Sequence, residues 1–279
     1  MLSIIVTHHQ TPILLKLCLK SIEENIASFG ANRDGQVNYE IIVVDSESQP
    51  ETEELIRNKF NQVKLISFSK NVGYAKIVNE GIKAAQGDYV LILNADIIIL
   101  GEAVRYLWEY LEEHPEVGIA GPQLVTFSNQ IQNSCFNFPS LGAIVARRTF
   151  LGELNWGKRK IGQFLIQEGD NLSARPVSWL QGSAMLVRGE AIEKVGLLDE
   201  RFFMYLEDTD WCRRFWQNGY QVVYQPKAKM AHYYYRASKK WGGFLDIFLN
   251  KYTRLHIISA LKYFWKWRQA KNINFETAK

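Results

Sequence analysis

The chain has 279 residues, of which 47% are hydrophobic and 22% charged, so it can bury a substantial core and lies at the upper end of single-domain length. Its cysteines, Cys18, Cys135 and Cys212, fit neither a zinc spacing nor a disulfide framework, which favours a reducing, cytoplasmic compartment. The first apolar segment is too short for a secretion signal, and no run of about 18 apolar residues predicts a membrane span.

The net charge of +4 is divided unevenly along the chain. Residues 227–279 hold 12 Lys and Arg against 2 Asp and Glu, which leaves 21 against 27 in residues 1–226, out of totals of 33 and 29. The body is therefore acidic and the tail basic. Basic tails rich in aromatic residues can bind nucleic acid, but an acidic body would repel a phosphate backbone, so we expect no nucleic-acid partner.

Residues 1–121 alternate short apolar runs with helical patterns, which predicts βαβ units and a mainly parallel sheet flanked by helices. Predicted strands cover residues 3–6, 40–44, 63–67, 89–93 and 117–120. Predicted helices begin at Pro12 and Pro50, run from residue 73 to 85, and run from residue 102 to 113 before His114-Pro115.

Residues 122–176 mix Asn, Gln, Ser, Gly and Pro with scattered aromatics and show no sustained period. We interpret them as a long loop region over one edge of the sheet. Beyond them we predict an extended segment at 179–187, a helix at 190–195 and a helix from Glu207 that Asn218-Gly219 closes.

After Trp241, apolar side chains recur every three or four residues, which is the spacing of an amphipathic helix. The stripe comprises Leu245, Phe248, Tyr252, Leu255, Ile258, Leu261 and Phe264, and it is surrounded by Lys251, Arg254, Lys262, Lys266 and Arg268. Such a helix either docks on the body or lies on an anionic membrane surface with Trp265 and Trp267, and the pattern leaves both interpretations open.

Thr7, Asp45 and Asp96 follow predicted strands, at the edge where open parallel sheets collect their ligands. An aspartate in such a place can also cap the next helix. Asp96 lies between the apolar runs 89–93 and 97–100, where a carboxylate is costly without a partner cation. Mg²⁺ and Mn²⁺ bind carboxylates together with phosphate oxygens, so we predict a divalent-metal site, with an ordinary turn aspartate as the alternative.

Asn71-Val72-Gly73-Tyr74 places a glycine before a predicted helix, where backbone N–H groups favour phosphate, although it is neither a dinucleotide fingerprint nor a P-loop. Glu207, Asp208 and Asp210 open another predicted helix directly after an aromatic segment. Acids there are commonly caps, but a carboxylate in partly apolar surroundings also suits a general base. We expect one of the three to be catalytic and two to be caps or ion-pair partners.

Taken in their order and spacing, these motifs resemble glycosyltransferase family 2, the inverting enzymes of the GT-A fold, and within it a bacterial rhamnosyltransferase-like branch. The resemblance rests on residues 3–7, 42–48, 71–74, 87–96, 181–185 and the Glu207-Asp208 pair. It implies an α/β GT-A catalytic domain over residues 1–240, with a nucleotide-sugar half at 1–121 and an acceptor half at 122–240. Residues 241–279 would then form a basic amphipathic helical tail.

The resemblance also implies roles for single residues. Donor and nucleotide contacts fall on Thr7, Asp45, Asn71, Gly73, Asp88, Asn94, Ala95 and Asp96. Asp96 stands where the last acid of the family's Asp-X-Asp element contacts the metal, while Asn94 replaces its first acid. His232 falls where some relatives supply a further metal or diphosphate contact, with a structural role as the alternative. The acceptor side corresponds to Gln181, Gly182 and Glu207. Asp208 corresponds to the catalytic base of the family.

The implied reaction is a single displacement with inversion, in which Asp208 removes the acceptor proton and Mg²⁺ or Mn²⁺ on Asp96 stabilises the leaving nucleotide diphosphate. The branch implies dTDP-rhamnose as donor, with a UDP-sugar as the alternative, and a glycan or lipid-linked glycan acceptor in cell-surface polysaccharide synthesis. A sugar nucleotidyltransferase is a second interpretation, but it needs a glycine-rich basic loop that residues 7–12 do not provide. A catalytically inactive nucleotide-sugar-binding relative is the third.

Overall fold

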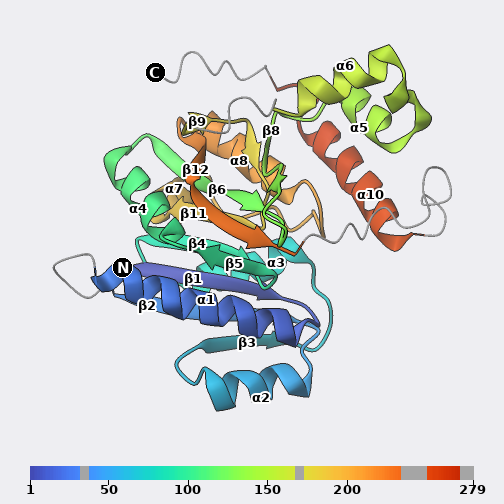
Figure 1. The fold of residues 1–279 in the computed structure, drawn as a ribbon. Helices are drawn as coiled ribbons and strands as arrows, with labels where there is room; N and C mark the ends of the chain where they lie inside the picture. Colours follow the sequence, from blue (N-terminus) through green and yellow to red (C-terminus); the bar gives the residue numbers. More distant parts are fainter. Residues whose placement is uncertain (32–37, 167–172, 234–249, 271–279) are drawn as a thin grey trace.

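The computed structural model describes residues 1–31, 38–166, 173–233 and 250–270 (Figure 1). The elements of its first part are β1 (Leu2–His8), α1 (Pro12–Ala31), β2 (Tyr39–Ser46), α2 (Pro50–Lys59), β3 (Lys64–Phe68), α3 (Tyr74–Ala84), β4 (Tyr89–Asn94), β5 (Ile97–Leu100), α4 (Ala103–Glu113) and β6 (Val117–Val125). The strands and helices predicted for residues 1–121 are confirmed, and β5 is an addition to them.

The second part of the chain alternates shorter elements. They are β7 (Ile131–Gln132), β8 (Cys135–Phe136), α5 (Leu141–Arg148), the 3-10 helix η1 (Phe150–Glu153), α6 (Asn155–Phe164), β9 (Arg175–Pro176), β10 (Trp179–Leu180), β11 (Ala184–Arg188), α7 (Gly189–Val195), α8 (Glu207–Gln217), β12 (Gln221–His232) and α10 (Lys251–Lys266). The predicted helices at 190–195 and from Glu207 are confirmed as α7 and α8.

The main sheet has the strand order β3-β2-β1-β4-β11-β6-β12-β5, with β7 beside β6 and β9 beside β12. The four strands from β3 to β4 are parallel, as predicted. β11 runs antiparallel to both of its neighbours, β4 and β6. The segment that precedes β11 therefore lies at the same edge as the carboxyl ends of β1, β2 and β4.

Helices cover both faces of the sheet (Figure 1). Along β1, Ile4 and Val6 join one core with apolar residues of α1 and α4, while Ile5 joins a second core with residues of α3, α7 and α8. This is the two-residue period of a strand, whose side chains alternate between faces. Because both faces are covered, each central strand is apolar throughout, as the sequence pattern indicates.

The predicted long loop over residues 122–176 is wrong, because this region contains β7, β8, β9 and a helical hairpin formed by α5, η1 and α6. Ser140 caps α5, its Oγ accepting a hydrogen bond from the N–H of Ala143. With eight and ten residues, α5 and α6 are too short to show a sustained period. Gly157 is a packing residue of α6, since a Cβ there would lie 1.9 Å from the Leu151 oxygen.

Two further differences concern strands. The predicted extended segment at 179–187 is interrupted, because β10 and β11 flank a loop at residues 181–183. β12 is not among the predicted elements; Pro226 lies within it, and proline is uncommon in central strands. The structure accommodates that proline by a register shift between Gln225 and Lys229 in the pairing with β6.

α10 packs on the body through Ala260 and Tyr263, which are buried in one cluster with Phe202 and Leu206. This contact supports the docking interpretation for this part of the tail. Residues 241–249 of the predicted stripe, with Trp241, Leu245 and Phe248, lie outside the described residues. None of the helices that the structure describes is long and apolar enough to cross a membrane. The division of the chain at residues 121 and 240 stays a prediction.

Candidate active site

β1 and β4 end side by side, and their last residues bind one another. Thr7 pairs in register with Asn94, and its Oγ1 donates a hydrogen bond to Asn94 Oδ1 at 3.0 Å. The N–H of Ala95 donates to the backbone oxygen of Thr7 at 2.9 Å. The structure thus brings three predicted donor contacts together at the carboxyl edge of the sheet, where Thr7 holds the turn after β4.

Asp45, at the carboxyl end of β2, is fully buried and does not cap a helix. Its Oδ1 lies 2.7 Å from Nδ1 of His8. His8 Nε2 accepts a hydrogen bond from the N–H of Thr11 at 2.9 Å, so Nδ1 carries the ring proton and donates it to Asp45. The second oxygen, Oδ2, accepts no hydrogen bond from any residue that the structure describes. Because this oxygen is buried, the nucleotide contact predicted for Asp45 stays a prediction.

Asp96 lies in the turn between β4 and β5, and its side chain is 29% exposed. His232, at the end of β12, places Nε2 3.6 Å from Asp96 Oδ2, while Asp96 Oδ1 is buried and accepts no hydrogen bond within the described ranges. No group of three or more His, Cys, Asp or Glu side chains in those ranges is arranged so that it could hold a metal ion by itself. Two protein ligands suit a Mg²⁺-type ion, which takes its remaining oxygens from phosphates and water.

The Asn71–Tyr74 loop clasps the segment that precedes α8. Asn71 Oδ1 accepts the N–H of Gly73 at 3.0 Å, and the N–H of Tyr74 donates to the Phe203 oxygen at 2.8 Å. Gly73 has a φ of 87°, and a Cβ there would lie 2.5 Å from that same oxygen. Only glycine fits this close approach, which explains the residue that the sequence motif singles out.

The loop at residues 181–183 connects the two halves of the site. Gly182 donates its N–H to Asp208 Oδ2 at 3.0 Å, and its carbonyl accepts a hydrogen bond from the Tyr74 hydroxyl. The Ser183 oxygen accepts the N–H of Asn94 at 2.9 Å. Gln181 contributes its N–H to a structural bond with the Ser134 oxygen. Because β11 opposes β4, this loop contacts both Asp208 and Asn94, which lies two residues before Asp96.

Asp208 is held by N–H groups on both carboxylate oxygens. Oδ1 accepts from the Thr209 N–H at 2.7 Å, in addition to the Gly182 contact on Oδ2. Burial nevertheless raises the pKa of Asp208 above its usual range. Glu207 beside it is 5% exposed, and its pKa lies well above the usual range, because of burial first and the neighbouring Asp208 second.

The residues directly before these acids have an unusual backbone. Tyr205 and Leu206 have φ values of 74° and 66°, so two successive residues with side chains adopt the left-handed region. Such conformations cost of order 1 kcal/mol each and persist where the surroundings enforce them. Leu206 also lacks a side-chain hydrogen bond to the helix, so α8 begins without an ordinary cap. These two residues form the turn that precedes Asp208, whose carboxylate lies beside the loop at 181–183.

Tyr74 is a site residue to which the sequence analysis assigns no role. Its pKa is raised well above the usual range by burial, and then by the charges of Glu207, Asp208 and Asp96. The hydroxyl therefore lies within electrostatic reach of all three acids. The sequence feature that could have indicated Tyr74 as a site residue is its place in the motif, directly after Gly73 and at the first position of α3.

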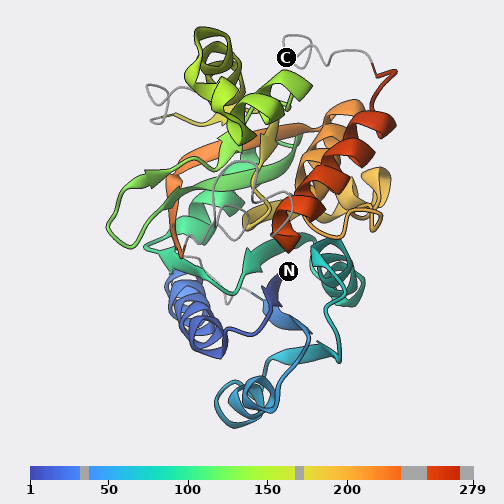
Figure 2. The same ribbon diagram turned by 90° about the vertical axis from the view of Figure 1, so that its right-hand side faces the viewer.

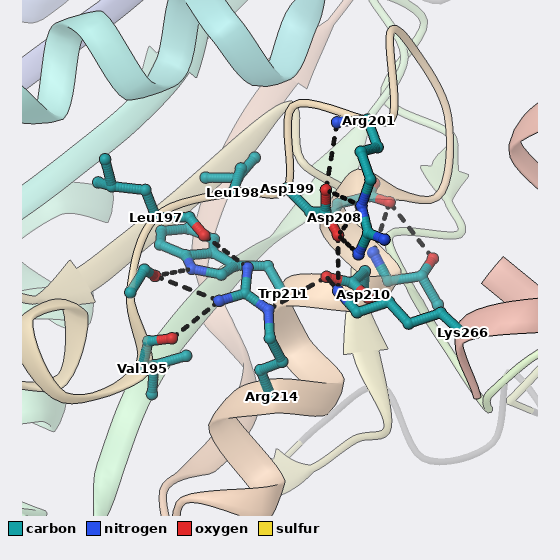
Figure 3. Close-up of polar contacts among 12 residues, drawn as sticks. Val195, Leu197, Leu198, Asp199, Arg201, Asp208, Asp210, Trp211, Arg214 and Lys266 are labelled. Carbon is teal, nitrogen blue, oxygen red and sulfur yellow. Dashed lines mark hydrogen bonds and ion pairs between the residues drawn. The ribbon is translucent and has the colours of Figure 1, made fainter. Parts of the chain in front are cut away.

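Asp210, in the first turn of α8, is fully buried and binds α10 (Figure 3). Lys266 Nζ lies 2.7 Å from its Oδ1, and Trp267 Nε1 donates to Oδ1 at 2.9 Å. Arg214, one turn further along α8, donates from Nε to Oδ2 at 3.1 Å. Asp210 is thus an ion-pair partner, as expected for two of the three acids. Its contacts join the tail helix to the helix that carries Asp208.

The structure does not bring Asp88 to this edge. It precedes β4, at the opposite end of the strand from Asn94, and its exposed carboxylate lies 2.7 Å from the Met1 amine. A pocket of about 470 Å³ lies on this opposite side, lined by Ile82, residues 85–90, residues 188–190, Ile192 and Glu193. The prediction that Asp88 contacts the donor is not supported by this placement, because the intervening strand spans about 20 Å.

Two family models match the chain. The family described as Glycosyl transferase family 2 matches residues 3–162, and the one described as Glycosyl transferase family group 2 matches residues 89–270. N-acetylglucosaminyl-diphospho-decaprenol L-rhamnosyltransferase of Mycobacterium tuberculosis is 30% identical over 226 residues, which are 76% of this chain and 71% of the relative. Rhamnosyltransferase WbbL of Escherichia coli is 30% identical over 203 residues, 71% of this chain and 70% of the relative.

Solved structures resemble the fold. A structure of GalNAc-T7 with UDP, GalNAc and Mn2+ has a TM-score of 0.61 at 14% identity and covers 84% of this chain and 43% of its own. S. aureus TarS has a TM-score of 0.57 at 13% identity and covers 99% and 41%. This chain therefore spans about two fifths of those two chains. The predicted GT-A fold is confirmed, and, because each of the two family models matches more than half of its residues, the chain belongs to glycosyltransferase family 2.

Proposed function

We propose that the chain transfers a sugar from a nucleotide diphosphate to a hydroxyl group of a glycan or lipid-linked glycan, with inversion at the anomeric carbon. The observation that carries the proposal is the loop at 181–183. Its Gly182 N–H binds Asp208, and its Ser183 oxygen binds the backbone that leads into Asp96. An acid suited to the attacking hydroxyl and an acid suited to the leaving diphosphate therefore lie at one edge of the sheet.

Family 2 glycosyltransferases typically depend on a divalent metal, and we propose that this one does. Asp96, with an unused buried Oδ1, and His232 fit a Mg²⁺ or Mn²⁺ ion that is also bound by diphosphate oxygens. When bound, the ion would stabilise the charge that develops on the leaving group. Thr7, Asp45 and the Asn71–Tyr74 loop would hold the nucleotide around it.

Asp208 is the proposed base. As the acceptor oxygen bonds to the anomeric carbon and the bond to the diphosphate breaks, the hydroxyl proton passes to Asp208. The N–H groups of Gly182 and Thr209 fix the direction of the carboxylate. The raised pKa strengthens the base, provided that the working pH keeps it ionised. Glu207 and Gln181 would lie toward the acceptor.

The names of the relatives support a substrate class. Both relatives at 30% identity are rhamnosyltransferases by name, and one name specifies a diphospho-decaprenol carrier. Poly-beta-1,6-N-acetyl-D-glucosamine synthase of Staphylococcus epidermidis, 27% identical over 68% of this chain and 41% of its own length, is named for a polymer. We therefore propose dTDP-rhamnose before UDP-sugars as donor. The enzyme would act at the cytoplasmic face of the membrane, with residues 241–279 in peripheral contact.

A panel of nucleotide sugars, tested with Mn²⁺, with Mg²⁺ and with EDTA, would test the proposal. We expect one donor to raise the melting temperature in the presence of metal and to release nucleoside diphosphate when an acceptor is added. Release of pyrophosphate would instead identify the sugar nucleotidyltransferase. Metal-dependent donor binding without turnover, for every acceptor in the panel, would identify the inactive relative.

A further inference from the structure

The tail helix α10 has two chemically different faces. Its inner face docks on the body through Ala260 and Tyr263. Four large apolar side chains of α10 are exposed, Ile257 at 36% among them, and the three most exposed are Ile258 at 47%, Leu261 at 66% and Trp265 at 70%. They follow one another at three- and four-residue spacing and so form one stripe. Docking on the body accounts for the inner stripe only.

The helical hairpin of α5 and α6 continues this apolar surface. Its exposed large side chains are Leu141, Val145, Leu154 and Trp156. The Trp156 ring lies against α5, since a Cβ on Gly142 would be 3.3 Å from it. Ile144 of α5 packs against the cluster that contains Tyr263 of α10. The hairpin and α10 are therefore neighbours, and Figure 2 shows both on the side that faces the viewer.

The charged residues of this surface are mostly basic. α10 contains no acidic residue, and Glu153 is the single acid between Leu141 and Phe164. Exposed basic residues flank the apolar ones: Lys158 and Arg159 on α6, and Arg254, Lys262 and Arg268 at α10. The Arg268 guanidinium lies 4.2 Å from the centre of the Trp265 ring. Exposed apolar side chains with a basic surround are the composition of a membrane-surface helix.

We propose that the outer stripe of α10 and the exposed side of the α5–α6 hairpin, together the α5–α10 face, rest on an anionic lipid bilayer. The inference rests on the proposed function for its purpose. The carboxyl edge of the parallel strands faces the same side of the molecule as the α5–α10 face (Figures 1 and 2). A lipid-linked acceptor in the bilayer is thereby presented to the edge that carries Asp208.

The charge distribution favours lipid over two other occupants. A second copy of this chain would bring a face of the same positive sign, so two such faces repel one another. Nucleic acid would bind the basic residues but would leave Leu141, Leu154 and Leu261 without an apolar environment. An anionic bilayer satisfies both parts, because its head groups attract the cations and its acyl boundary receives the apolar side chains.

Vesicle flotation of the full chain tests the proposal, with phosphatidylcholine vesicles that contain or lack phosphatidylglycerol. Two double variants remove the apolar contacts, Leu261→Ser with Trp265→Ser, and Leu154→Ser with Trp156→Ser. Each should lower the partition coefficient on anionic vesicles about tenfold. Tyr39→Ser is the control, because this exposed aromatic residue begins β2, at the end of the sheet opposite its carboxyl edge. This control should bind like the parent chain.

Equal binding to both kinds of vesicle, no binding to either, or unchanged binding of both double variants would overturn the proposal. So would self-association in sedimentation velocity that the same double variants abolish, because the face would then join two copies. Sugar transfer to a short-chain, water-soluble acceptor distinguishes a failure of the membrane proposal from a failure of the proposed function. It should be unchanged in both double variants, and a chain without any transfer activity would still give a vesicle result.

Discussion

Asp96 and Asp208 lie at the same edge of the sheet in different chemical settings. The Asp96 carboxylate is 29% exposed, faces His232 and keeps one oxygen without a hydrogen bond from the described part of the chain. The Asp208 carboxylate has N–H donors on both oxygens and a pKa raised by burial. An oxygen left unused suits a cation, whereas a firmly directed carboxylate of raised proton affinity suits a proton. Position at the edge of the sheet therefore does not by itself define the role of an aspartate.

The largest effect should follow the loss of the proposed base. Asp208→Asn keeps the size of the side chain but removes its ability to take a proton, so transfer should fall about a hundred- to ten-thousand-fold. Metal-dependent donor binding, measured by thermal shift, should persist. Asp88→Asn is the matched control at the opposite edge and should transfer normally. Wild-type transfer by Asp208→Asn would remove the base assignment.

Asp96→Asn tests the other aspartate, the proposed metal ligand. Loss of the carboxylate should reduce transfer on the order of a hundredfold and abolish the metal dependence of donor binding, which Asp208→Asn retains. His232→Asn should weaken the response to metal about tenfold, as expected for a partner of the main ligand. Titration of Mn²⁺ in the presence of donor measures both. If the Asp96 variant responded to metal like the parent, the metal would be bound elsewhere.

Lys266→Met tests whether α10 supports the setting of Asp208. The substitution leaves the fully buried Asp210 with Arg214 and the Trp267 N–H as partners. Because Lys266 is 22% exposed, we expect unfolding free energy to fall by about 2 kcal/mol, less than for a fully buried pair. Transfer should also fall relative to donor hydrolysis by water, a ratio that does not depend on the folded fraction.

Lys251→Met is the control for that substitution, since Lys251 is exposed on the same helix. It should change neither unfolding nor the ratio of transfer to hydrolysis, and Lys266→Arg should preserve much of both. A constant ratio in Lys266→Met, despite lower stability, would show that α10 holds the fold without directing the base.

The smallest effect concerns stability and pH. Burial raises the pKa of Glu207 and Asp208 in the folded chain, so the folded state binds more protons than the unfolded chain does. The two carboxyl groups therefore contribute their full stabilisation below the pKa of the unfolded chain, about pH 4. This stabilisation is lost as the pH rises through their raised pKa values in the folded chain. Glu207→Gln should flatten this fall in urea unfolding measured across pH.

Glu80 offers a control of opposite sign. Hydrogen bonding from Lys83 lowers its pKa, so its stabilising effect is present above the ordinary range and is lost as pH falls. Glu80→Gln should therefore lower stability at neutral pH and leave the fall due to Glu207 in place. Identical pH profiles for the parent and Glu207→Gln would contradict the raised pKa of Glu207.

The sequence predicts the parallel half well because its strands are local and apolar on both faces. It also predicts that Thr7, Asp45 and Asp96 share an edge, since parallel strands end together. Position along the sequence misleads for Asp88, which is near Asp96 in the chain but at the other end of β4. Roles that depend on distant partners leave no periodic signal.

Three features depend on residues that are distant in the sequence. The Lys266 contact with Asp210 spans 56 residues, and nothing in the spacing of either helix indicates it. Pro226 argues against a strand at β12, yet the structure accommodates this proline by a register shift, which sequence rules do not predict. Tyr74 acquires its place among three acids only when the loop at 181–183 arrives beside it.

The antiparallel placement of β11 also affects when the site forms during folding. Leu93 pairs with Ala184, so the edge closes only when segments about ninety residues apart meet. Such pairings carry a loop-closure cost that must be met before their contacts stabilise the chain, and they form slowly. A nascent chain that ends after β6 contains Asp96 but not Asp208. The two acids therefore cannot meet at this edge until synthesis has passed residue 208, so the edge that carries both of them forms late.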